Sequence, residues 1–249
     1  MSSLRIIALS GMFFLALAGA EQVSSAGVNT QTTTLENKVD ALVADMSKDD
    51  PASKYAVFKF VYEHRKQLPE ERSRALQLLM ESAADGYTVA QYNLAILYYY
   101  GQWVEKNREF ALRWMMMAAT SGMPEAELET GSQLYEFAAK EKSDGQQKLY
   151  LANSEYWLRK ALSSDEIDDE LRLLAKTRLA RTITFGDSTN PVGRKMLAEA
   201  ACAGQEEAIS LLKSDKALAE EWAAEGEEQA QKVLASIVDN IPDDCDVLQ

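Results

Sequence analysis

The chain has 249 residues, of which 47% are hydrophobic, so it is long and apolar enough to bury a sizeable core. Acidic side chains outnumber basic ones by 39 to 26, which gives a formal net charge of −13. This balance argues against a nucleic-acid partner, which needs a basic surface, and is compatible with a basic protein partner.

The N-terminus has the pattern of a signal peptide over residues 1–20. Arg5 precedes an apolar run over residues 6–17, and the small residues Ala18, Gly19 and Ala20 form a cleavage site. The run is too short to span a bilayer comfortably, and no other stretch approaches 18 apolar residues. We therefore expect a periplasmic or secreted bacterial protein that makes no stable membrane insertion after cleavage.

Residues 21–50 predict a polar linker followed by a short amphipathic helix. The linker covers residues 21–32, and Thr33 with Glu36 has the spacing of a capping box. Apolar residues then recur at helical intervals, at Leu35, Val39, Leu42, Val43 and Met46. We interpret this helix as a cap on the first repeat; the alternative is a self-association or docking helix.

A helical region begins at residue 51 and extends to about residue 240. Asp50 and Pro51 are typical of a helix start, and the helix that follows extends to about Arg65. Next come a first helix (A) over residues 70–84 and a second helix (B) over residues 87–100, ended by Gly86 and Gly101.

The sequence of this pair is repeated along the chain. Four residues recur 36 positions later: Ala75, Ala83, Gly86 and Ala90 return as Ala111, Ala119, Gly122 and Ala126. The same skeleton returns at Ala201, Gly204, Ala208 and Leu212, and at Ala223, Gly226, Ala230 and Leu234. A fixed period of this size indicates stacked supersecondary units.

These residues resemble the Sel1-like repeat, a short α/α repeat related to the tetratricopeptide family. The residues that match the repeat are Ala111, Trp114, Ala118, Ala119, Gly122 and Ala126, and in the preceding unit Ala90, Leu94, Tyr98 and Gly101. The resemblance implies an all-α fold, a right-handed α/α solenoid of about five helical pairs over residues 51–240. It also implies a concave groove lined mainly by A helices.

Three departures from the repeat are visible. Thr130 replaces a leucine, the closing glycine slips to Gly145, and an acidic loop is inserted at residues 165–170. Downstream, Ala175, Leu179, Ala180 and Gly186 restore the B-helix spacing, and Asn190 with Pro191 begins the next A helix. The last pair is expected around residues 222–238, followed by an acidic tail over residues 241–249.

Cys202 and Cys245 are the two cysteines of the chain. An even number in an oxidising compartment favours a disulfide between them, which would tie the C-terminal tail to an earlier helix. The alternative is a pair of free thiols.

Little in the sequence points to catalysis, a cofactor or a metal. His64 has no neighbour at ligand spacing, and we expect no metal site and no cofactor. Ser210 and Lys213 match an S-x-x-K motif, but its companion K-T-G is absent and such a match is expected by chance. We therefore expect no enzymatic activity.

The candidate site consists of apolar residues beyond those that a core face needs. Met80, Met116 and Met117 fall outside the core positions of their A helices, and Tyr99 and Tyr100 extend the aromatic run beyond Tyr98. Methionines adapt to partners and aromatic residues anchor interfaces, so we predict partner binding here. The alternative is that neighbouring units cover these side chains.

The hypothesis for function is an exported scaffold that binds another protein through its repeat groove, and the acidic balance of the chain favours a basic partner. The family resemblance implies roles such as an envelope regulator, an assembly factor or a virulence accessory, and an immunity protein that neutralises a toxin is compatible with it. The alternative is a secreted penicillin-binding or β-lactamase-like hydrolase.

Overall fold

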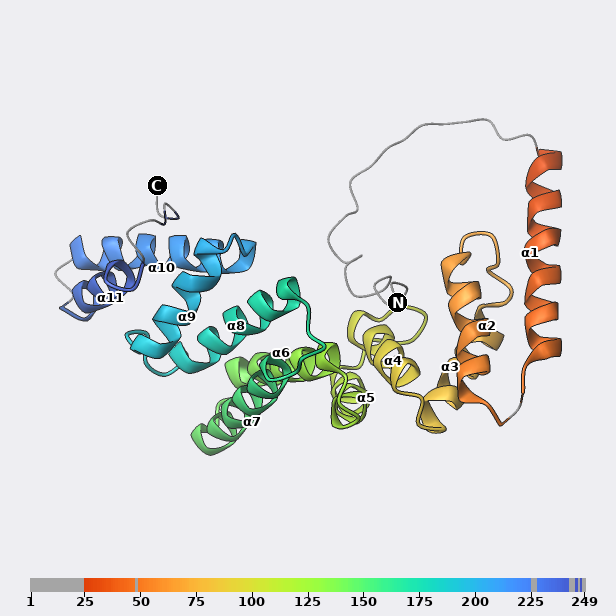
Figure 1. The fold of residues 1–249 in the computed structure, drawn as a ribbon, viewed down its shortest axis with the longest axis horizontal. Coiled ribbons are helices and arrows are strands. Elements are labelled where there is room, and N and C mark those ends of the chain that lie inside the picture. The colour runs from red at the N-terminus through yellow and green to blue at the C-terminus, as the bar shows by residue number, and fades with distance from the viewer. Residues whose placement is uncertain (1–24, 48, 225–227, 242–244, 246, 248–249) are drawn as a thin grey trace. The chain divides into compact units, whose positions relative to one another are not determined.

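The computed structural model of the chain describes residues 25–47, 49–224, 228–241, 245 and 247, and all regular secondary structure within them is α-helical (Figure 1). The all-α fold class is therefore as predicted. The chain divides into two compact units, residues 1–114 (unit 1) and residues 115–249 (unit 2). The predicted signal peptide lies outside the described residues.

Unit 1 contains four complete helices and the first half of a fifth. They are α1 (Ser25–Asp45), α2 (Pro51–Glu63), α3 (Arg72–Ala84), α4 (Thr88–Tyr100) and the part of α5 (Arg108–Thr120) that ends at Trp114. Unit 2 contains the rest of α5, α6 (Pro124–Lys140), α7 (Asp144–Leu162), α8 (Asp169–Thr184), α9 (Pro191–Cys202), α10 (Glu206–Ala224) and α11 (Glu228–Val238). From α1 to α4 in unit 1 and from α6 to α11 in unit 2, helices that follow one another in the chain pack together.

The helix boundaries have local causes that the sequence signalled. The Asp50 carboxylate accepts hydrogen bonds from the backbone N–H groups of Ala52 and Ser53, each at 3.1 Å, at the start of α2. Asn190 caps α9 in the same way. Gly86 and Gly101 have φ values of +89° and +75°, in the left-handed region that glycine adopts without strain.

The core of unit 1 is formed by α2, α3 and α4 and is covered by α1. Val57 and Leu79 are fully buried in this core, and Val39 of α1 is also fully buried against it. The α1 helix therefore packs on α2, and its role as a cap stays a prediction.

The start of α1 differs from the expectation. The helix begins at Ser25, so residues 25–32 are helical and Thr33 lies inside the helix instead of at its N-cap. No proline or glycine lies between Val28 and Asp50, so the helix anchored by Val39 continues toward the N-terminus beyond the capping-box spacing.

The core of unit 2 follows the predicted repeat positions. Ala175, Leu179 and Ala180 of α8 are fully buried, as their B-helix spacing predicted. Leu158 of α7 packs with Leu179, and Ala180 packs with the core residues of α9 and α10. Small alanine side chains let these helices approach closely.

The helices of the α6–α7 hairpin are longer than helices α2 to α5. The helices α2, α3, α4 and α5 have 13 residues each, whereas α6 has 17 and α7 has 19. Gly145 lies in the first turn of α7, so the expectation that it closes a helix is wrong. The connection between the two helices is only residues 141–143, and the helical segments extend up to it.

The C-terminal region also differs from the prediction. The α10 helix continues from Glu206 to Ala224, through the point at which a last helical pair was expected to begin. Residues 216–224 combine strong helix formers with an ion pair between Lys216 and Glu220 at 3.4 Å, which favours this continuation. The α11 helix then packs on α10 and α9.

Cys202 and Cys245 form a disulfide, with their Cα atoms 5.5 Å apart. The bond attaches the C-terminal tail to the end of α9. Ile241 and Val247, on either side of Cys245, are half-buried against the core that includes Leu197 and Leu212. The tail therefore packs against unit 2 in addition to being tied to it.

Candidate protein-interaction site

The solvent face of α5 is the part of the candidate site that the helix geometry defines best. Four residues on one face of the helix are fully buried, namely Ala111, Met115, Ala118 and Ala119. Met116 and Met117 lie on the other side of the helix and are 38% and 46% exposed. The three-methionine run is therefore divided between core and surface, because successive residues of a helix point about 100° apart.

Tyr99 and Tyr100 lie at the end of α4 in unit 1. Tyr100 is 54% exposed, Tyr99 is half-buried, and their rings make a T-shaped contact with centroids 5.0 Å apart. The Arg108 guanidinium lies 5.2 Å from the centre of the Tyr99 ring. Tyrosine and arginine are the residue types that most often dominate binding energy at protein interfaces.

Met80 occupies a different environment from the other predicted residues. It is half-buried on α3 and packs against the core of unit 1. Met80 belongs to unit 1, and Met116 and Met117 belong to unit 2. A patch that joins these three methionines therefore stays a prediction.

The sequence reasoning did not name Phe110, which is 46% exposed on α5. Its ring stacks on Tyr98 with centroids 5.6 Å apart, and the Arg113 guanidinium lies 5.6 Å from the ring centre. The signal was present, since Phe110 directly precedes the core residue Ala111 and so falls outside the core face.

Negative charge is distributed unevenly between the units. Residues 1–114 carry 13 acidic and 12 basic side chains, whereas residues 115–249 carry 26 and 14. Almost all of the acidic excess therefore belongs to unit 2, the unit that contains Met116 and Met117.

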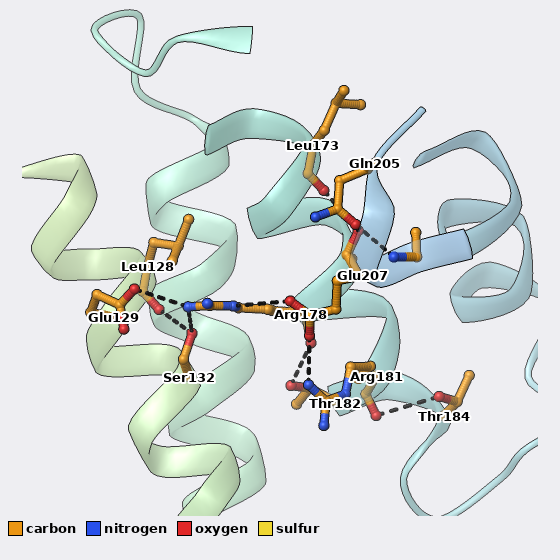
Figure 2. Close-up of polar contacts among 12 residues, drawn as sticks. Leu128, Glu129, Ser132, Leu173, Arg178, Arg181, Thr182, Thr184, Gln205 and Glu207 are labelled. Carbon is orange, nitrogen blue, oxygen red and sulfur yellow. Dashed lines mark hydrogen bonds and ion pairs between the residues drawn. The ribbon is translucent and has the colours of Figure 1, made fainter. Parts of the chain in front are cut away.

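A convergent polar cluster lies on the B helices α6, α8 and α10 of unit 2 (Figure 2). Arg178 of α8 donates to the Glu129 carboxylate at 3.1 Å and to the Ser132 hydroxyl at 2.6 Å, both on α6. Arg181 donates to the Glu207 carboxylate of α10 at 2.7 Å. We call these five residues the B-helix network; they connect three successive repeats.

The B-helix network stabilises the packing of the repeats and lacks the arrangement of a catalytic site. Both arginines are paired with glutamates, which neutralise their charges. The Ser132 hydroxyl donates to the Leu128 carbonyl at 2.7 Å, so its proton is directed at the backbone and not at a base. A serine nucleophile needs a neighbouring base to accept that proton.

The described part of the chain also shows no other grouping of side chains suited to catalysis or metal binding. Ser210 and Lys213 are both exposed on α10. No group of three or more histidine, cysteine, aspartate or glutamate side chains among the described residues could hold a metal ion. Within the same residues, no helix has the length and apolar character needed to cross a membrane.

Comparison with known proteins gives matches among solved structures. No protein-family model matches the sequence, and neither does any curated protein. A protective antigen of uropathogenic Escherichia coli strains, which displays a Sel1-like repeat fold, aligns with 86% of this chain at 20% identity and a TM-score of 0.52. This chain covers 45% of that protein.

A Sel1 repeat protein from Oxalobacter formigenes aligns with 57% of this chain at 26% identity, with a TM-score of 0.39, and 98% of that protein is covered. The Escherichia coli antigen shares the fold of this chain, and the repeated alanines and glycines lie at the buried and helix-end positions that the resemblance implied. The chain therefore has a Sel1-like repeat fold.

Proposed function

We propose that this chain is an exported scaffold that binds another protein, with α5 as the centre of the binding surface. The observation that carries the proposal is the exposure of Met116 and Met117 beside the fully buried Met115. Exposed side chains of this kind cost solubility unless a partner covers them, and methionine adapts to the shape of a partner.

The Sel1-like repeat fold supports a scaffold role, because stacked helical pairs present an extended surface to a partner. Within unit 1, Tyr99, Tyr100 and Phe110 at the end of α4 and the start of α5 are separate candidate contacts for a partner. The partner that fits this surface best has apolar side chains facing α5.

The acidic excess of unit 2 favours a partner with a basic surface beside those apolar side chains. Attraction over the range of a Debye length, about 10 Å at 0.1 M salt, would accelerate encounter with such a partner. An incoming basic toxin or a basic envelope enzyme has this character, so the proposed roles are immunity protein and regulator.

Export is part of the same proposal. The signal-peptide pattern of residues 1–20 and the Cys202–Cys245 disulfide both support an oxidising compartment.

Site-specific photo-crosslinking in the native cell tests the binding site. A photoreactive phenylalanine analogue at position 117 should crosslink one protein, which mass spectrometry identifies, and the same analogue at position 192 should not crosslink it. Val192 of α9 is a matched control because it is 55% exposed and lies in the same unit. Equal crosslinking from both positions, or none from position 117, would contradict the proposal.

A further inference from the structure

A second apolar surface lies on α7, away from the residues used above. The buried face of α7 includes Ser154 and Leu158, which are fully buried, and packs on α6 and α8. On the opposite face, Leu149 is 54% exposed and Tyr156 is 57% exposed. Ala152 lies between them and is also exposed, so the three residues form one stripe at helical spacings of three and four. We call Leu149, Ala152 and Tyr156 the α7 stripe.

The end of the stripe near the start of α7 is rich in lysine. Lys140, Lys142 and Lys148 are all exposed, and no ion pair within the described part of the chain engages them. The Glu141 carboxylate accepts hydrogen bonds from the backbone N–H groups of Lys142 and Ser143 at 2.9 Å, so it is directed at the backbone. Asp144, in the first turn of α7, is the other acid at this end.

The other end of α7 leads into an acidic loop that is firmly held. Four acidic side chains are exposed there: Asp165, Glu166, Asp169 and Glu170. Ile167 is only 6% exposed and anchors the loop in the core. Arg172 donates to the carbonyls of Leu162 and Ser164 at 3.0 and 3.2 Å, so this base is used to hold the loop backbone.

The helix therefore presents a basic end, an apolar centre and an acidic end along one direction. We propose that α7 is a self-association surface on which a second copy of this chain packs, with the two α7 helices antiparallel about a two-fold axis. A two-fold interface uses the same patch on both copies, so the patch must be complementary to itself when reversed. The α7 stripe meets that condition, because reversal places the lysine end of each copy opposite the acidic loop of the other.

The register of this pairing follows from the positions of the exposed residues. With the two-fold axis between Ala152 and Asn153, Leu149 of each copy lies opposite Tyr156 of the other. The same register places the start of each α7 beside the end of the other α7, and so brings the lysine-rich end of one copy near the acidic loop of the second copy. Arg159, which also borders the stripe, is neutralised by Glu155 at 2.8 Å and so does not repel Lys148 of the second copy.

Sedimentation equilibrium of the purified, oxidised exported protein tests this pairing. A single helix face is a small interface, so we expect a reversible dimer that dissociates on dilution, with a dissociation constant that rises at least tenfold between 0.05 and 0.5 M salt. Tyr156→Lys should raise the dissociation constant at least tenfold, whereas Val192→Lys on α9 should leave it unchanged. Leu149→Glu provides a second disrupting variant if Tyr156→Lys alters the far-UV circular dichroism.

Charge exchange tests the antiparallel arrangement directly. The variant Lys140→Glu/Lys142→Glu and the variant Asp165→Lys/Glu166→Lys should each be monomeric, and their equimolar mixture should form a heterodimer. A protein that is monomeric at every accessible concentration would overturn the proposal, and so would a dimer that survives both charge exchanges. Because the surface is on α7, either outcome leaves the proposed binding site on α5 standing.

Discussion

Gly131 of α6 and Leu158 of α7 are so close that a Cβ atom on Gly131 would lie 2.6 Å from Leu158 Cγ. It would also lie 3.0 Å from the Ser154 carbonyl oxygen, which belongs to the backbone and cannot rotate away. The Ser154 hydroxyl donates to the Gly131 carbonyl at 2.7 Å and holds the two helices at this distance. Gly131 therefore sets the spacing of the α6–α7 hairpin.

Gly131→Ala should lower the free energy of unfolding. Overpacking of this kind costs about 1–3 kcal/mol, which exceeds the gain of roughly 1 kcal/mol from replacing a helical glycine by alanine. Gly145→Ala is the matched control, since a Cβ at Gly145 in α7 would have no neighbour within 4 Å. Urea denaturation of both variants measures the difference, and an equal response at the two sites would contradict this account.

Among the described residues of the α6–α7 hairpin, Lys160 and Glu127 form the most buried ion pair. Lys160 Nζ lies 2.8 Å from Glu127 Oε1, and the glutamate side chain is 3% exposed. Lys160→Met should destabilise the protein by about 1–3 kcal/mol, because it leaves a buried carboxylate without its cation, although the lysine side chain itself is 35% exposed. The double variant Glu127→Met/Lys160→Met should lose less than Lys160→Met alone. Chemical denaturation gives both values, and additive losses would exclude the coupling.

The three successive methionines of α5 should differ sharply in how much each contributes to the stability of the fold. Met115→Ala should cost about 2–5 kcal/mol, because it opens a cavity at a fully buried position. Met116→Ala and Met117→Ala should each change stability by less than about 0.5 kcal/mol, since both side chains are exposed. Thermal unfolding of the three variants checks the helix register.

The double variant Met116→Lys/Met117→Glu then tests binding. It should abolish complex formation with the crosslinked partner while its circular dichroism and melting temperature stay near wild type. Undiminished affinity in a folded double variant would move the site elsewhere, with Tyr99 and Tyr100 the next residues to change.

The Cys202–Cys245 bond should form in exported protein and contribute to its stability. A separation of 43 residues corresponds to about 4 kcal/mol in the chain-entropy model. Alkylation under denaturing, non-reducing conditions should leave both sulfurs unlabelled, and reduction should lower the melting temperature. Stoichiometric labelling of both cysteines without reductant would show that the bond does not form in the cell.

The exported protein should begin at Glu21. Intact-mass spectrometry of the periplasmic fraction should show a chain that lacks residues 1–20. A chain that retains Met1, or one confined to the cytoplasm, would contradict the predicted export.

The repeat architecture was predictable because its residues have local geometric roles. Ala90, Ala111 and Ala126 are fully buried where helices approach, and Gly86 and Gly122 adopt positive φ at helix ends. Such roles recur at fixed spacing and are therefore visible in a sequence.

The ends of the fold were harder to predict because continuation of a helix depends on packing as well as on caps. Val39 anchors α1, which begins earlier than the Thr33 spacing suggested. The B-helix network was also invisible, since Glu129, Arg178 and Glu207 lie far apart in the sequence and meet only after the repeats stack. The same applies to the α7 stripe, whose exposure depends on which face of α7 packs on α6 and α8.

The length of the α6–α7 hairpin limits how many residues can be inserted into its helices without exposing their buried faces. Trp157 follows Trp114 by 43 residues instead of the 36 that separate Ala75 from Ala111, an excess of seven. The extra length is divided between α6 and α7, on either side of the connection at residues 141–143. Within a single helix, an insertion of seven residues is nearly two complete turns and rotates the residues beyond it by only about 20°. An insertion of about five residues inside α7 would instead turn the buried face that carries Trp157 and Ala161 toward solvent, so natural relatives should differ in the length of either helix by multiples close to seven.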